Sequence, residues 1–167
     1  GACFELVRRP ETILAGRILY ARDFGSFEAF DEAIGGVMEV DRERVLSRLA
    51  GMTRPDFDVR LSVNFWRPVE ERAYGFVREV ATAQQPEGVQ VCRMPGSLYL
   101  RARNDAAAAQ LLAKERCEMW ELFAYMREFV MPAHGLFMAN NGAQELEICD
   151  APESGLGWSY IPVQVNK

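Results

Sequence analysis

The sequence has little of what metal sites and nucleophilic enzymes need. It has one histidine, His134, and four cysteines, none of which fall in a C-x-x-C pair. Because zinc and redox sites require such ligands at close spacing, neither is predicted, and we expect the thiols to stay reduced. His134 follows Pro132 at the end of a predicted helix, where it serves no recognisable Ser-His-Asp set, and there is no glycine-rich phosphate loop. The sequence therefore predicts no metal and no cofactor.

The sequence also lacks an excess of basic residues and any long apolar run. Its formal net charge is −5 and its pI is near 5.0, which argues against a nucleic-acid-binding surface. No stretch reaches transmembrane length, and no charged segment leads into an apolar run with a cleavage site. We therefore expect a cytoplasmic protein without membrane contact that reaches DNA only through another domain. The start at Gly1, without a methionine, suggests a fragment of a longer chain.

Residues 144–165 are the most informative part of what is present, because two runs with alternating apolar residues flank a turn-rich connection. They predict a β-hairpin. In its first strand, Leu146 and Ile148 share one face, while the other face carries Glu145, Glu147 and Cys149.

The returning strand places Trp158, Tyr160 and Pro162 on one face, and pairing could bring this aromatic row beside the carboxylate row. A cup with aromatic walls and an acidic floor would hold an organic cation. The alternative is a half-exposed hairpin with a solvated acidic face.

The rest of the chain alternates predicted strands and helices. Strands are expected at residues 3–9, 12–21, 58–66 and 73–81, with a bulge or a close backbone approach at Gly16. A helix capped by Ser26 should break at Gly35-Gly36 and resume after Asp41. A second, long helix should run over about residues 105–130, with Asn104 or Asp105 as its cap. It should bury Met119, Phe123 and Met126, and Trp120 is assigned to the core.

The sequence shifted by 85 positions matches itself weakly, aligning the opening strands, the helices and the polar faces of two hairpins. We expect an α+β domain spanning residues 1–167, built of two pseudo-symmetric β-α-β-β modules at about 1–83 and 84–167, with antiparallel sheets and a ligand cleft between them. A chance match of two amphipathic patterns is the alternative. The first module would contribute Asn64 and Trp66 to the cleft, opposite the second hairpin.

This order of motifs resembles the GyrI-like, or effector-binding, domain family, which occurs at the C-terminus of AraC-type and MerR-type multidrug-responsive regulators and as free-standing proteins. The resemblance covers nearly the whole chain. Its motifs are FELVRRPETILAGR, VCRMPGSLYLRAR, ELEICD and WSYIPV, which match family motifs more convincingly by their order than one by one. It implies an SHS2-like duplication and an organic, often cationic, ligand.

By motif position the resemblance assigns the ligand counter-ion to Glu147 and a pocket wall to Tyr160. Tyr99, the tyrosine of the P-x-x-x-Y motif, is a further candidate ligand-binding residue. Three departures matter. Cys149 stands where the family has an aromatic residue, and Trp158 stands where it has an acid. The His-x-Gly that often follows the first strand of the family's second module is absent, and Asn104-Asp105 stands nearby. These changes suggest a more aromatic pocket with one principal carboxylate.

The leading hypothesis is a small-molecule sensor domain of a bacterial transcription regulator, with a homodimer left open. The alternatives are a free-standing hydrolase of electrophilic natural products, with Glu147 as base and Tyr160 as acid, and a protein-binding module of the gyrase-inhibitor type.

Overall fold

The computed structural model describes residues 4–55, 58–61, 67–115, 118–151 and 156–167. The chain forms two compact units: unit 2 is Thr12–Met94, and unit 1 joins Gly1–Glu11 to Pro95–Lys167. This division differs from the expected boundary near residue 83, because the pairing of strands decides which segments of the chain belong to the same unit. The N-terminal strand pairs with a strand of the C-terminal half, and residues 90–94 pair with the strand that begins at Thr12.

Unit 2 contains an antiparallel sheet with strands in the order β3 (Asp58–Leu61), β4 (Ala73–Val80), β2 (Thr12–Tyr20) and β5 (Gln90–Met94). The predicted pairing of residues 58–81 as a hairpin is confirmed by the antiparallel register of β3 and β4. The close approach at Gly16 is also confirmed, since a Cβ there would collide with the carbonyl oxygen of Phe76.

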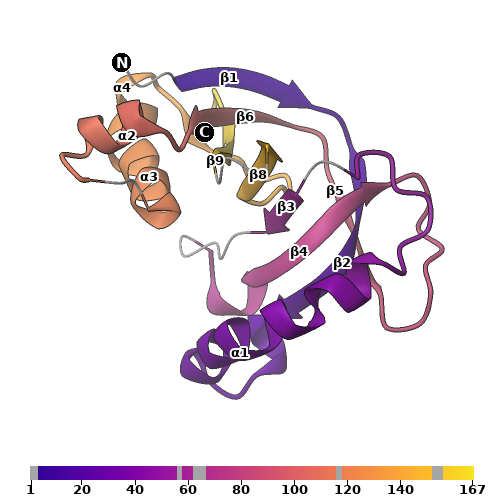
Figure 1. The fold of residues 1–167 in the computed structure, drawn as a ribbon. Coiled ribbons are helices and arrows are strands. Elements are labelled where there is room, and N and C mark those ends of the chain that lie inside the picture. Colours follow the sequence, from indigo (N-terminus) through magenta and orange to yellow (C-terminus); the bar gives the residue numbers. More distant parts are fainter. Residues whose placement is uncertain (1–3, 56–57, 62–66, 116–117, 152–155) are drawn as a thin grey trace. The chain divides into compact units, whose positions relative to one another are not determined.

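One long helix, α1 (Phe27–Leu46), packs against β2 and β4 (Figure 1). Ser26 caps it as predicted, because its side chain accepts a hydrogen bond from the Ala29 N–H at 3.1 Å. The predicted break at Gly35-Gly36 is wrong. Two exposed glycines cost a helix about 1 kcal/mol each, and burial of Phe30 and the C-terminal end of α1 offsets that cost. Short 3₁₀ turns, η1 (Ala21–Asp23) and η2 (Val69–Glu71), flank the sheet.

The antiparallel strands of unit 1 lie in the order β1 (Phe4–Arg9), β6 (Ser97–Arg103), β9 (Leu156–Gln164) and β8 (Leu146–Ala151). The short strand β7 (Phe137–Met138) also pairs with β9. The predicted hairpin at 144–165 is therefore confirmed as β8 and β9.

The helical part of unit 1 is interrupted, so the single helix expected over residues 105–130 is wrong. Asp105 caps a short helix, α2 (Ala106–Leu111), accepting from the Ala108 N–H at 3.0 Å. The helix ends in a Schellman motif: Ala113 has φ 55°, and the Lys114 N–H donates to the Ala109 carbonyl at 2.9 Å. Helices that end in this way usually have a glycine at the left-handed position. Here the residue is an alanine, so the sequence did not reveal the end of the helix.

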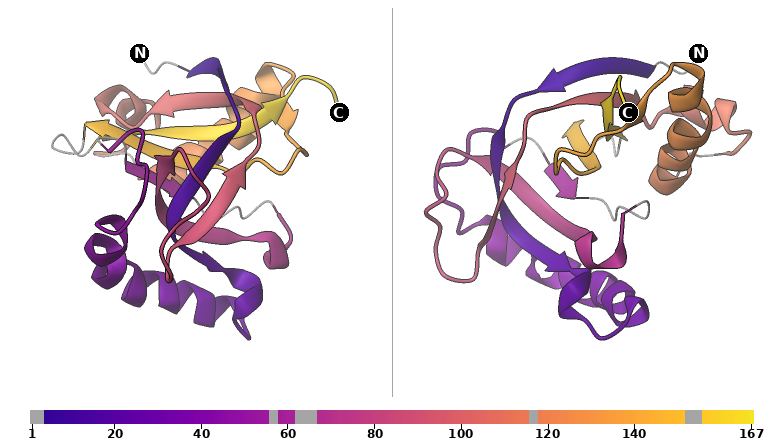
Figure 2. Two further views of the ribbon diagram at one scale, coloured as in Figure 1. Left: turned by 90° about the vertical axis from the view of Figure 1, so that its right-hand side faces the viewer. Right: turned by 180° about the vertical axis from the view of Figure 1, so that it is seen from behind.

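The chain turns helical again in α3 (Met119–Tyr125), a π-helical turn η3 (Met126–Val130) and α4 (Met131–Ala133). Figure 2 shows these helices beside β6 and β9, whose Leu100 and Ile161 join their core. Phe123 and Met126 are buried as predicted, whereas Met119 is only partly buried. The assignment of Trp120 to the core is wrong, since it is 67% exposed.

Among the described residues, no helix combines the length and apolarity needed to cross a membrane.

Candidate functional site

The register of β8 and β9 decides which side chains of the hairpin share a face. Leu146 lies opposite Tyr160 and Ile148 opposite Trp158, whereas Glu147 lies opposite Ser159. Directly opposed residues of an antiparallel pair point to the same face. The aromatic row therefore shares its face with Leu146 and Ile148, and the prediction that it lies beside the Glu147 row is wrong. A one-residue difference in register exchanges the faces of a strand, and alternation alone does not fix register.

Strand β6 supplies the charged neighbours of the aromatic row. Arg101 lies opposite Tyr160 and Arg103 opposite Trp158. The guanidinium carbon of Arg101 is 4.2 Å from the centre of the Trp158 ring system, and that of Arg103 is 4.9 Å from it. Both distances fall within the range of cation–π attraction. The ring that we expected to receive a foreign cation is thus stacked with the chain's own arginines.

Strand β1 supplies the carboxylate of this face, because Glu5 lies opposite Arg101. Arg101 donates to Glu5 Oε1 from Nε at 2.6 Å, and its Nη2 lies 2.5 Å from the same oxygen. Its Nη1 donates to the Tyr160 hydroxyl at 2.9 Å. Partial burial lowers the pKa of Arg101, but the hydrogen bonds to Tyr160 and Glu5 outweigh this and raise the pKa above its ordinary value.

Tyr160 is the most buried of the side chains that meet around Arg101, at 4% exposure. Tyr99, which is also buried, meets it edge to face at 5.8 Å, and Arg9 lies 5.5 Å from its ring centre. We refer to the side chains that meet around Arg101 as the arginine–aromatic cluster, comprising Glu5, Arg9, Arg101, Arg103, Trp158 and Tyr160.

The other predicted site residues lie elsewhere. Glu145 is buried at 1% exposure and receives a hydrogen bond from Arg127 Nη1 at 2.7 Å, so it forms an ion pair with the π-helical turn. Cys149 is partly buried and takes part in no disulfide among the described residues. Asn64 and Trp66 fall outside the described residues.

Glu147 is partly buried on the face of Ser159, whose hydroxyl donates to the Met119 sulfur at 3.7 Å. That is the side on which α3 packs. Because Glu147 and Tyr160 leave opposite faces of the hairpin, they cannot flank one substrate as a base and acid pair. Among the described residues, no three His, Cys, Asp or Glu side chains gather as a metal site would require.

Sequence reasoning missed the arginines, although their pattern was visible. Tyr99, Arg101 and Arg103 alternate along one strand, as Glu5 and Arg9 do along another. Alternation is the signal that assigned Trp158 and Tyr160 to one face. Applied to the neighbouring strand, it would have placed Arg101 and Arg103 together on one face.

No family model and no curated protein matches the sequence. Solved structures do match. The EcmrR C-terminal domain has a TM-score of 0.55 at 14% identity, covering 98% of each chain. SAV2435, in a structure with bound tetraphenylphosphonium, has a TM-score of 0.59 at 14% identity, covering 96% of this chain and 93% of that one.

EcmrR in a complex with DNA gives a TM-score of 0.56 at 12% identity, and there the match spans 98% of this chain but 57% of EcmrR. At these identities the likeness establishes the fold. The chain has the α+β fold of the EcmrR C-terminal domain and SAV2435, in agreement with its resemblance to the GyrI-like effector-binding domains.

Proposed function

We propose that the chain is the small-molecule effector-binding domain of a cytoplasmic bacterial transcription regulator of the multidrug-responsive type, acting on DNA through a separate domain. Two likenesses support this role. The EcmrR C-terminal domain belongs to a protein that was solved on DNA, and SAV2435 was solved with a lipophilic cation. The ligand we propose is a lipophilic aromatic cation.

The observation that carries the proposal is the placement of the Arg101 guanidinium. It stacks on Trp158, bonds to the Tyr160 hydroxyl and pairs with Glu5. A guanidinium is a planar, delocalised cation, so these three residues already form the environment that an organic cation needs. The ligand would replace Arg101, stack on the same rings and take Glu5 as its counter-ion.

Glu5 therefore takes the role that the sequence had assigned to Glu147. Tyr160, Trp158 and Tyr99 keep their roles as aromatic walls.

The other arginines determine how apolar this ligand must be. A cation at about 5 Å from Arg9 or Arg103 meets a repulsion on the order of 3 kcal/mol in a surface-like dielectric. Cation–π attraction of about 0.5–2 kcal/mol does not cover that cost. Burying roughly 200 Å² of apolar surface contributes about 5 kcal/mol. A polyaromatic cation meets this requirement, and a small quaternary ammonium ion does not.

The ligand-binding unit would be one half of a duplicated domain. The two units have the same strand order if β1, β6, β9 and β8 are matched with β5, β2, β4 and β3. The 85-residue shift relates β2 at 12–20 to β6 at 97–103, and β4 at 73–80 to β9 at 156–164. This correspondence supports two copies of one β-α-β-β module, each extended by a strand.

Calorimetric titration with tetraphenylphosphonium and its neutral relative triphenylphosphine oxide tests the proposal. Arg101→Met should increase the affinity for the cation, because it removes the competitor and leaves the rings and Glu5 in place. Glu5→Gln should weaken the cation alone, and Trp158→Ala should weaken both compounds. Glu147→Gln is the matched control and should change neither. If neither the wild type nor Arg101→Met binds the phosphonium, the cation-sensor function is wrong.

A further inference from the structure

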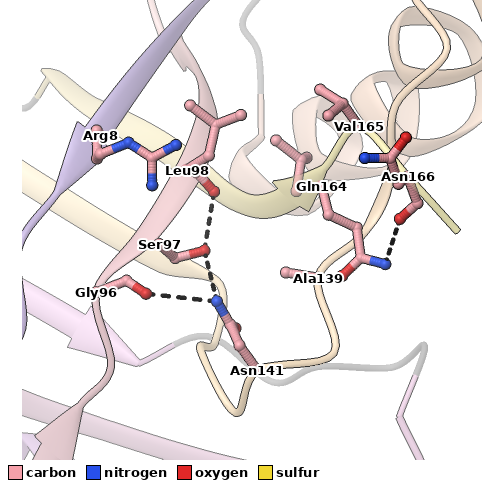
Figure 3. A pocket seen from close by; sticks show the side chains of 10 residues that line it. Arg8, Gly96, Ser97, Leu98, Ala139, Asn141, Gln164, Val165 and Asn166 are labelled. Carbon is pink, nitrogen blue, oxygen red and sulfur yellow. Dashed lines mark hydrogen bonds between the residues drawn. The ribbon is translucent and has the colours of Figure 1, made fainter.

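Unit 1 also contains a pocket of about 360 Å³ that the proposed effector site does not use (Figure 3). It lies between the first residues of β6, the segment that follows β7, and the C-terminal end of β9. Arg8 of β1 borders it, and its polar wall contains Ser97, Asn141 and Gln164.

Two apolar residues of the pocket lining lie on the opposite face of the sheet from the arginine–aromatic cluster. Leu98 and Val163, which line the pocket, are register partners on β6 and β9. Leu98 and Arg101 are three positions apart on the same strand, so their side chains leave opposite faces. A molecule that rests on Leu98 and Val163 therefore would not compete with one stacked on Trp158.

The polar groups of the wall are held in place by the protein itself. Asn141 Nδ2 donates to Ser97 Oγ at 3.2 Å, and its Oδ1 accepts from the Ala143 N–H at 3.0 Å. Gln164 Oε1 accepts from the Asn140 N–H at 3.0 Å. The wall is therefore preorganised and does not require polar partners from a ligand.

The remaining lining consists of an apolar floor and one charge. Leu98, Ala139 and Val163 form the floor, and Ala139 and Val163 are almost fully buried. Arg8 is the only charged residue in the lining. It is exposed, and within the described part of the chain it makes no ion pair or side-chain hydrogen bond. A guanidinium offers a planar fork of donors that fits a carboxylate through two bonds.

We infer that this pocket binds a small organic carboxylate, with the carboxylate on Arg8 and an apolar body on the Leu98–Val163 floor. Its volume lies within the range of small-molecule sites, roughly 300–1,000 Å³. A phosphate dianion fits less well, because one guanidinium beside an apolar floor supplies too few donors for it.

The test is a titration of the whole chain with octanoate and octan-1-ol, below the concentration at which octanoate forms micelles, followed by calorimetry and two-dimensional NMR. Octanoate should bind one to one and shift the amide signals of Leu98, Ala139 and Val163. Arg8→Gln should weaken octanoate roughly tenfold to hundredfold, and octanol binding should stay the same. Arg22→Gln is the matched control, because Arg22 is an exposed arginine of unit 2 that stacks on Tyr20; it should leave octanoate affinity unchanged.

Two outcomes would overturn the inference: wild-type protein that does not bind octanoate saturably, or equal octanoate affinity in the wild type and Arg8→Gln. Tetraphenylphosphonium binding should not depend on Arg8. Failure of the carboxylate site can therefore be distinguished from failure of the effector-site proposal.

Discussion

Arg101 and Tyr160 face each other across β6 and β9, and Nη1 of the arginine donates to the tyrosine hydroxyl at 2.9 Å. Tyr160 is almost fully buried and the Arg101 side chain is 27% exposed, so water replaces this bond poorly. The bond holds the guanidinium over the aromatic row, where its second anchor is Glu5. The pairing thereby couples the stability of unit 1 to the availability of its proposed ligand site.

Removing that hydroxyl should affect both properties. Tyr160→Phe keeps the ring but removes the acceptor of a charged donor, so we expect a loss of about 1–2 kcal/mol in the free energy of unfolding. Arg101 should also become easier to displace, which increases tetraphenylphosphonium affinity. Urea unfolding and calorimetry measure the two effects. An unchanged stability would show that the bond contributes nothing in solution.

The hairpin and its two rows could be predicted because alternation follows directly from strand geometry. The pairing offset could not, since both strands have apolar residues on at least one face and either register buries some of them. Only the observed pairing of Leu146 with Tyr160 and Ile148 with Trp158 shows that Glu147 lies on the other face. The counter-ion prediction depended on that undetermined offset.

The positions at which helices end were the other feature that the sequence did not predict. Gly35-Gly36 suggested a break that α1 does not have, whereas Ala113 ends α2 without any glycine. In both places packing and hydrogen bonds outweigh local propensity, which amounts to about 1 kcal/mol.

Replacing Gly16 and Gly36 by alanine should have opposite effects on stability. Gly16→Ala would place a Cβ against the Phe76 carbonyl oxygen and 2.9 Å from Val77 Cα, both backbone atoms that cannot move aside cheaply. We expect a loss of several kcal/mol or failure to fold. Gly36→Ala in the exposed part of α1 meets no atom within 4 Å and should stabilise by about 0.5–1 kcal/mol. Thermal unfolding of the pair decides this, and a destabilised Gly36→Ala would contradict the continuous helix.

Cys92 should make the fold sensitive to alkaline pH. Burial raises the pKa of its thiol above the ordinary value of 9.0. The unfolded chain therefore releases this proton first, and stability that is complete below pH 9 falls as pH rises through the folded-state pKa. Burial also raises the pKa of nearby Tyr20, and the charge on Cys92 adds to that rise.

The corresponding measurement is urea unfolding at pH 7 and again between pH 9 and 10. Cys92→Ala should lose less stability between the two conditions than the wild type does. Equal losses in both proteins would mean that the Cys92 thiol is not the group responsible.

The helical core of unit 1 offers a final contrast between two aromatic residues of α3. Phe123 is 2% exposed and packs in the cluster with Met126 and Ile161, whereas Trp120 is 67% exposed. Phe123→Ala should cost about 3–5 kcal/mol, because it removes buried surface and leaves a cavity. Trp120→Ala should change stability by less than about 0.5 kcal/mol. Both substitutions exchange an aromatic residue for a better helix former, so helix propensity does not separate them. Equal losses in urea unfolding would show that Trp120 is covered in solution, and a Phe123→Ala loss below about 1 kcal/mol would contradict the packing of α3 on β9.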